Sequence, residues 1–313
     1  MKPCSDLSRL ELVIEGDNQA SGNPTMTITN PVENHYGVGG ILDSILKALT
    51  DMGKDVHQLT PIDLAPVDEF HIRGRDATIE LARRASLTAR MHILDVGCGL
   101  GGSARYLATE YQCHVTGVDL TQEYIDVATA LAKLVGLQEA VRFRQANALE
   151  LPFNDQAFDI VWTEHVQMNI ADKHGFYSEI ARVLKPGGRL VFHDIFQGTG
   201  GEPHYPVPWA EERSISTLAP IANMKDILEG AGLLVLDWAD RSDHSIEWFQ
   251  NMVEKMQNAG PPSLGLHLLT GKTAKEKFAN VLRNLKEKRI VVFQGVTGSR
   301  AERPATGRGL AGS

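Results

Sequence analysis

Short apolar runs alternate along the chain with longer stretches in which apolar residues recur every three or four positions. The short runs have the length of buried strands, whereas the periodic stretches have the spacing of amphipathic helices. Strands are expected at residues 92–95, 115–119, 141–145, 158–162, 189–194, 233–236 and 290–294. Helices are expected between them at residues 103–111, 122–134, 173–183 and 226–231. This alternation predicts an α/β fold with a doubly wound, Rossmann-like sheet.

The segment before the first strand, residues 31–90, has the pattern of an N-terminal helical cap. Its apolar positions indicate one helix at 41–49 and a second at 76–87. Residues 59–74 lie between them and contain Pro61 and Pro66. Because proline interrupts the helical hydrogen-bond pattern, this stretch is expected to be an extended loop.

Two further helical patterns lie between the last two strands, at about 243–288, and predict a helical insertion. Their apolar stripes are expected to pack against the sheet, or against the partner subunit of a homodimer. The main domain is expected to span residues 91–296. Residues 1–30 are polar and aperiodic and predict a mobile tail, while residues 297–313 lack an apolar pattern and predict a disordered one.

Charge and composition exclude several classes of protein. The net charge of -8 argues against nucleic acid as a substrate, because phosphate binding requires a surface rich in Lys and Arg. The three cysteines, Cys4, Cys98 and Cys113, have no metal-ligand spacing, and no metal is expected. The sequence contains no apolar run of about 18 residues and no signal-peptide pattern, so we expect a cytoplasmic protein that does not associate with membranes.

A glycine-rich turn after the first strand carries the clearest chemical signal. Asp95 lies near the end of the strand, and Gly97, Gly99 and Gly101 follow in the turn. Glycines allow the backbone to approach a ligand, and the N–H groups that open the next helix can donate to its polar end. Asp119 ends the second strand, where a carboxylate can accept from both ribose hydroxyls. These features predict an adenosine-containing ligand.

The spacing of Gly97, Gly99 and Gly102 also satisfies the dinucleotide-binding pattern, so a dehydrogenase is an alternative. Asp95 argues against it. An acid at this position would repel a pyrophosphate and attract the ammonium group of a methionine moiety.

The block Asp95–Gly102, followed by an acid at the end of the next strand, resembles the class I S-adenosylmethionine-dependent methyltransferases. Residues 147–153, 158–162 and 181–190 add further matches in the expected order. The resemblance implies a seven-stranded sheet whose last strand is antiparallel, with S-adenosylmethionine as cofactor. The cofactor-binding residues that the resemblance implies are Asp95, Gly97, Cys98, Gly99, Gly101, Asp119, Leu120, Asn147, Ala148 and Glu164. The family commonly has Asp-Ala where this chain has Asn147-Ala148, and the amide oxygen of Asn147 can accept the same hydrogen bond from adenine.

The loop after the fourth strand, residues 163–170, is the expected floor of the acceptor site, because reactions in doubly wound sheets take place at the carboxyl ends of the strands. His165 in this loop is the candidate catalytic residue. It would act as a base if the acceptor must lose a proton, and would otherwise orient the acceptor. The candidate substrate-binding residues are Tyr36, His71, Arg73, Asn169, Tyr205 and Trp209.

Residues 35–296 further resemble bacterial sarcosine/dimethylglycine N-methyltransferases, mainly in segments 162–170 and 205–210. The resemblance implies transfer of a methyl group to the nitrogen of a small zwitterionic amino acid. A thioether such as that of methionine would suit the same site. Two alternatives remain: methylation of a larger hydroxylated or aromatic metabolite, and a module that binds S-adenosylmethionine without catalysis.

Overall fold

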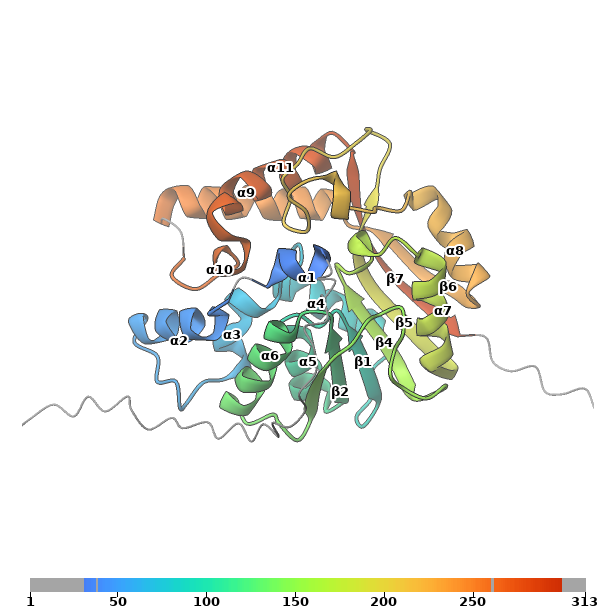
Figure 1. Cartoon of the computed structure of the whole chain (residues 1–313), viewed down its shortest axis with the longest axis horizontal. Coiled ribbons are helices and arrows are strands. Elements are labelled where there is room, and N and C mark those ends of the chain that lie inside the picture. Colours follow the sequence, from blue (N-terminus) through green and yellow to red (C-terminus); the bar gives the residue numbers. More distant parts are fainter. Residues whose placement is uncertain (1–30, 38, 260–261, 300–313) are drawn as a thin grey trace, which may run out of the picture. The chain divides into compact units, whose positions relative to one another are not determined.

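A single seven-stranded sheet organises the protein (Figure 1). The computed structural model describes residues 31–37, 39–259 and 262–299, so the predicted tail at 1–30 and residues 300–313 lie outside the described residues. The strand order is β3-β2-β1-β4-β5-β7-β6. The strands are β1 (His92–Val96), β2 (His114–Asp119), β3 (Val141–Gln145), β4 (Phe158–Glu164), β5 (Leu184–Gln197), β6 (Leu233–Asp240) and β7 (Ile290–Ser299). Only β7 runs antiparallel to its neighbours, which confirms the predicted doubly wound sheet with an antiparallel last strand.

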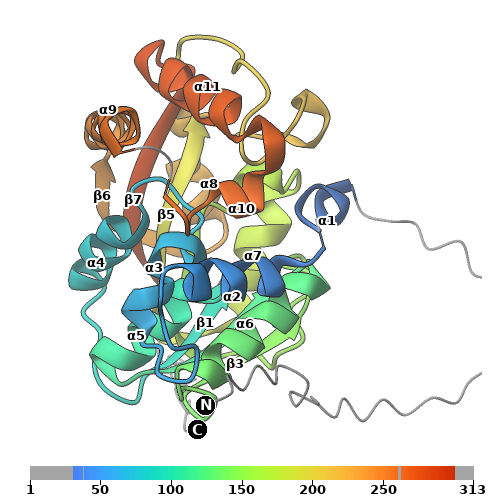
Figure 2. The ribbon, with the colours of Figure 1, turned by 90° about the vertical axis from the view of Figure 1, so that its left-hand side faces the viewer.

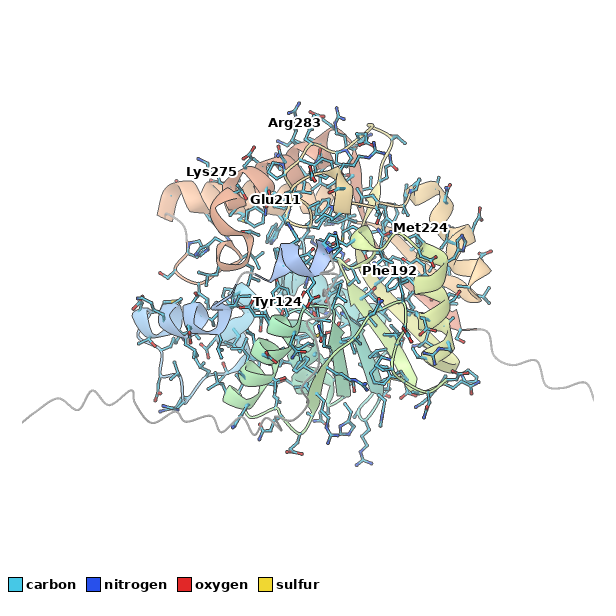
Figure 3. All side chains as sticks on the ribbon, viewed as in Figure 1. Tyr124, Phe192, Glu211, Met224, Lys275 and Arg283 are labelled. Atoms are coloured by element: carbon cyan, nitrogen blue, oxygen red, sulfur yellow. The ribbon has the colours of Figure 1, made fainter. Side chains whose placement is uncertain are left out.

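Helices cover both faces of the sheet and bury its apolar side chains. One face packs against α4 (Gly74–Arg84), α5 (Gly102–Tyr111) and α6 (Gln122–Leu134). The other face packs against α7 (Lys173–Val183) and α8 (Met224–Gly230). Phe192 and Met224, labelled in Figure 3, belong to the buried cluster on this second face.

The order of the strands reverses between β1 and β4, and this reversal determines where a ligand can bind. β1 pairs in parallel with β2 on one side and with β4 on the other. Val96 is in register with both Val118 and Thr163, so the three strands end at one edge of the sheet. A crevice at such a reversal is the usual ligand site of an open α/β sheet.

Two groups of helices border this edge. The N-terminal group consists of α1 (Pro31–Tyr36), α2 (Ile41–Asp51), α3 (Pro61–Asp68) and α4. The later group, between β6 and β7, consists of α9 (Ser242–Ala259), α10 (His267–Thr270) and α11 (Ala274–Lys286). In Figure 1, α1 lies between the strand edge and the later helices, and Figure 2 shows it on the side of the molecule opposite α9. No helix in the described part of the chain has the length and apolar character needed to cross a membrane.

The extended loop predicted at 59–74 is wrong, because residues 61–68 form α3. Thr60 and Asp63 make a capping box, and Pro61 occupies the first turn, where its missing N–H is not needed. Leu64 and Val67 are buried on the inner face. Favourable capping and burial therefore outweigh the helix-breaking tendency of Pro66 inside the helix.

The strands β5 and β7 are longer than their apolar runs predict. β5 begins at Leu184, whereas the strand was expected at 189–194, and through a bulge it includes Gly187 and Gly188. β7 continues to Ser299, three residues into the segment expected to be disordered. Thr297 and Gly298 pair with both β5 and β6, so backbone hydrogen bonds compensate for the weak apolar pattern.

Candidate active site

The turn between β1 and α5 places three glycines in the left-handed region, with φ of 74° at Gly97, 52° at Gly99 and 79° at Gly101. A Cβ on Gly97 would lie 2.4 Å from Val166, and one on Gly101 would lie 2.5 Å from Phe143. A Cβ on Gly99 would meet no described atom within 4 Å. Packing therefore requires Gly97 and Gly101, whereas Gly99 faces open space where a ligand can approach.

Asp119 lies beside this turn at the end of β2. Its carboxylate accepts hydrogen bonds from the N–H of Gly99 at 3.0 Å and from the N–H of Thr121 at 2.9 Å. Burial raises its pKa, and the two backbone donors oppose that effect. The next residue, Leu120, accepts a hydrogen bond through its carbonyl from Gln145. The turn and the acid that were predicted to bind adenosine are thus directly connected.

Asp95 is buried on the other side of the turn, with 2% of its surface exposed. Its Oδ2 atom has no hydrogen-bond partner among the described residues. Burial raises its pKa well above the ordinary value, and the nearby carboxylates of Glu164 and Asp119 add to the shift. A buried carboxylate oxygen without a donor fits the ammonium group of S-adenosylmethionine, which would supply the missing hydrogen bond and positive charge. Cys98 is buried in the same turn, and burial likewise raises the pKa of its thiol.

Asn147 and Ala148 follow β3 at the rim. Asn147 is exposed, and its Oδ1 accepts a hydrogen bond from the N–H of Leu149 at 3.0 Å. The oxygen that was expected to accept from adenine is thus engaged within its own turn. Ala148 is half-buried against the core of the α7 face.

Glu164 connects three parts of the fold. Its carboxylate accepts hydrogen bonds from Trp162 Nε1 on β4 at 2.8 Å, from Ser103 Oγ on α5, and from Thr78 Oγ1 on α4 at 3.3 Å. His71 Nε2 lies 3.3 Å from the same carboxylate. Glu164 therefore joins the N-terminal cap to the sheet, and its donors Thr78 and Ser103 were not selected from the sequence.

His71 and Glu69 extend this buried polar cluster into the cap. His71 Nε2 lies 3.0 Å from Gly74 O and 3.0 Å from Thr78 Oγ1. Glu69 accepts a hydrogen bond from Arg75 Nε, and its Oε2 lies 3.0 Å from Thr78 Oγ1, whose one hydrogen is shared between Glu69 and Glu164. Burial raises the pKa of Glu69 to about 7, against the opposing charges of His71 and Arg75. The His71 ring is thus already in contact with Gly74, Thr78 and Glu164.

His165 adopts a left-handed backbone conformation, with φ of 55°. Its N–H donates to His193 O at 2.9 Å, and its ring stacks on the His193 ring with centroids 5.1 Å apart. Its Nε2 atom is buried and has no partner among the described residues. Burial lowers its pKa well below the ordinary value, so the ring is neutral at pH 7. His165 therefore offers an imidazole that is free to make a new hydrogen bond.

Tyr36, Asn169 and Trp209 form one connected group over the acceptor floor. The Tyr36 hydroxyl donates to Asn169 Oδ1 at 3.0 Å. Asn169 Nδ2 in turn donates to the carbonyls of Trp209 and Ile215, at 2.9 and 2.8 Å. The Tyr36 ring also contacts Tyr124, which extends from α6 in Figure 3. The loop after β4 is thus tied to α1 and to the segment that follows β5.

Tyr205 and Arg73 are less closely connected to these groups. Tyr205 is half-buried and packs against the apolar cluster that contains Trp209. Arg73 donates from Nη1 to Glu80 at 2.8 Å, and Arg84 and Arg241 contact the same carboxylate. The Arg73 guanidinium is therefore part of an ion-pair network between α4 and the start of α9. Among the described residues, no group of three or more His, Cys, Asp or Glu is arranged to hold a metal ion.

Comparison with known proteins agrees with the cofactor that the sequence predicts. Residues 94–192 match the model of a methyltransferase domain. Methyltransferase GfsG of Streptomyces halstedii is 32% identical over 216 residues, which cover 66% of this chain and 76% of that protein. O-methyltransferase rstn1 of Aspergillus nomiae is 30% identical over 210 residues, which cover 66% of this chain and 93% of that protein. The glycine/sarcosine/dimethylglycine N-methyltransferase of Actinopolyspora halophila is 26% identical over 206 residues, but these cover only 36% of that protein.

Among solved structures, geranyl diphosphate C-methyltransferase from Streptomyces coelicolor, in complex with S-adenosyl-L-homocysteine, superposes with a TM-score of 0.63. The match covers 86% of this chain and 98% of that one, at 17% identity, and shows a common fold. Together with the relatives and the family model, this fold excludes the dehydrogenase alternative. The chain belongs to the class I S-adenosylmethionine-dependent methyltransferases, and S-adenosylmethionine is its cofactor.

Proposed function

We propose that this enzyme transfers the methyl group to a hydroxyl oxygen of a largely apolar metabolite. The observation that carries the proposal is the composition of the cluster beside the acceptor floor. Its members come from α1, the loop after β4, the segment after β5 and the later helices α9 and α11. They include Tyr36, Met168, Trp209, Phe249, Met252 and Phe278. An acceptor held by such side chains gains affinity mainly from apolar burial.

The charges around this cluster argue against a carboxylate anchor. Arg73 is paired with Glu80, Arg75 with Glu69, and Lys277 on α11 with Glu211. Lys277 is itself buried, so its partner cannot be withdrawn without leaving a charge uncompensated. A small zwitterion would have to compete with these acids for a cation.

His165 supplies the chemistry that a hydroxyl acceptor needs. The bound cofactor supplies a methyl group activated by its positive sulfur. A hydroxyl oxygen becomes neutral after methylation only if it loses its proton. We assign that proton to Nε2 of His165, which is neutral and unpartnered.

The names of two relatives support oxygen as the methylated atom. Two of them, from Aspergillus nomiae and Aspergillus sclerotiorum, are O-methyltransferases, each 30% identical over about two thirds of this chain. The sarcosine-type relative covers a smaller share of its own length. Methylation of a zwitterionic amino acid at nitrogen or sulfur therefore stays a prediction and becomes the competing outcome of the test.

The test is release of S-adenosylhomocysteine from purified protein with S-adenosylmethionine and two sets of acceptors. The first set holds catechols, naphthols and long-chain hydroxy acids, and the second holds glycine, sarcosine, dimethylglycine and methionine. We expect turnover with a member of the first set and none with the second. Turnover with the second set alone would overturn the proposal.

A further inference from the structure

His193 on β5 is a buried histidine that the sequence pattern does not distinguish from the apolar residues around it. It has no exposed surface, and its Nε2 lies 2.9 Å from the carbonyl oxygen of Ile72. Because a carbonyl can only accept, Nε2 must carry the hydrogen. Burial lowers the pKa of His193 to about 3, so the ring stays neutral across the physiological range.

His193 holds His165 at two points. Its carbonyl accepts the N–H of His165 at 2.9 Å, and its ring stacks on the His165 ring at 5.1 Å with an interplanar angle of 24°. One contact restrains the backbone and the other restrains the imidazole. The backbone contact continues the β4–β5 pairing and does not depend on the side chain at 193, so only the stacking is specific to histidine. The φ of 55° that these contacts accompany is unfavourable for a residue that has a Cβ.

We propose that His193 is the positioning residue of the base: it holds His165 in its left-handed conformation with Nε2 free for the acceptor's proton. This inference rests on the proposed function, because a base is needed only when the acceptor loses a proton. His193 itself does not touch the acceptor.

The stacking geometry determines how His193 can act. The two rings are inclined by only 24°, and neither His165 Nε2 nor His193 Nδ1 has a hydrogen-bond partner among the described residues. The two imidazoles therefore share no hydrogen bond. Edge contacts from His71 to both rings, with centroids 6.1 and 5.9 Å away, restrain the pair further. The interaction is therefore stacking and not proton sharing.

Two substitutions separate the ring of His193 from its hydrogen bond. His193→Phe keeps an aromatic ring and loses the donor to Ile72. His193→Gln keeps a donor that can reach Ile72 and loses the ring. A residue needed only for folding would tolerate Gln at least as well as Phe, because a buried carbonyl left without a donor is unfavourable.

The experiment measures kcat and KM of the wild type and both variants with catechol, together with S-adenosylhomocysteine affinity by calorimetry. We expect His193→Gln to lower kcat by about 10- to 100-fold through misplacement of His165, with KM and affinity changed by less than about threefold. His193→Phe should retain kcat within about threefold of the wild type. Equal losses in both variants, or full activity of His193→Gln, would overturn the inference.

A second measurement is independent of the acceptor. Histidine side-chain NMR of the full chain bound to S-adenosylhomocysteine should give one sharp set of His165 signals in the wild type, and broadened or doubled signals in His193→Gln. If no hydroxylated probe is methylated, the proposed function fails, while this readout still tests positioning. Identical His165 signals in the wild type and His193→Gln would contradict the inference in either case.

Discussion

The carboxylate of Asp119 accepts a hydrogen bond from the N–H of Gly99 at 3.0 Å. This bond joins the end of β2 to the turn that follows β1, the neighbouring strand. It holds the acid beside Gly99, whose Cβ position faces open space. The glycine-rich turn and Asp119, which the sequence analysis identified separately, are therefore joined by a hydrogen bond.

Asp119→Ala should weaken S-adenosylhomocysteine binding by at least about tenfold, because the ribose loses a charge-assisted partner and the turn loses its acceptor. Calorimetry of purified protein measures this affinity. Asp126→Ala is the matched control, since Asp126 is exposed on α6 and contacts only Gln122 in the described structure. Equal affinities for the two variants would show that Asp119 does not hold the cofactor.

The glycines of the turn should respond differently to alanine. Gly101→Ala places a Cβ 2.5 Å from Phe143 and should lower the free energy of unfolding by about 2–4 kcal/mol, from strain and overpacking. Gly99→Ala meets only the backbone strain, about 1–2 kcal/mol, but its methyl group enters the ligand space. Urea unfolding and calorimetry should therefore show Gly101→Ala as the less stable variant. Unimpaired cofactor binding by Gly99→Ala would contradict this arrangement.

A buried ion pair fastens the cap to the main domain. Arg105 Nη2 on α5 lies 2.5 Å from Asp68 Oδ2 on α3, and both side chains are 1% exposed. Arg105→Met should lower the free energy of unfolding by about 3–5 kcal/mol, because Asp68 is left as an unpaired buried charge. Lys47→Met, which breaks an exposed pair with Asp51, should cause no measurable change. Similar values for the two variants in urea unfolding would refute the role of the buried pair.

Glu69 should make the protein less stable as the pH rises. Burial raises its pKa from 4.5 to about 7, so the folded state holds this proton more tightly than the unfolded state. The stability that it contributes is complete below about pH 4.5 and is lost as the pH rises through 7. Glu69→Gln cannot ionise. The unfolding free energy of the wild type relative to this variant should therefore fall by about 3 kcal/mol between pH 4.5 and 7.5.

Glu80 provides a control of opposite sign. Burial raises the pKa of Glu80, but hydrogen bonds and charges from Arg73 and Arg241 outweigh burial and hold this pKa below its ordinary value. Its contribution is therefore lost as the pH falls. The stability difference between the wild type and Glu80→Gln should shrink toward low pH. A difference for Glu69→Gln that follows the same trend as that for Glu80→Gln would contradict the assignment.

Local signals explain why so much of the sheet and the cofactor turn could be predicted. A glycine such as Gly99 after an apolar run, or an acid such as Asp119 at a strand end, has a meaning that does not depend on distant residues. The helix α3 was missed because Pro61 and Pro66 are local breakers, whereas its capping box and its buried face stabilise it.

The polar cluster around Glu164 could not be predicted in the same way. Thr78 is 86 residues away in the chain and Ser103 is 61 residues away, so only the fold brings their hydroxyls to one carboxylate. His193 lies within an apolar run that reads as an ordinary strand. Arg73 was predicted to bind a substrate. Its pairing with Glu80 arises because Arg73 is the N-cap residue of α4, whereas the sequence placed it in a loop at 59–74.

The most direct test of the account is the position of the methyl group after reaction with S-adenosylmethionine labelled as CD3. Mass spectrometry would locate the label in the products of a mixture of hydroxylated apolar acceptors and zwitterionic amino acids. We predict O–CD3 in a hydroxylated product, with His165→Ala lowering turnover by about 100-fold or more while S-adenosylhomocysteine affinity stays within about threefold. Label on the nitrogen or sulfur of an amino acid, formed equally well by His165→Ala, would contradict it.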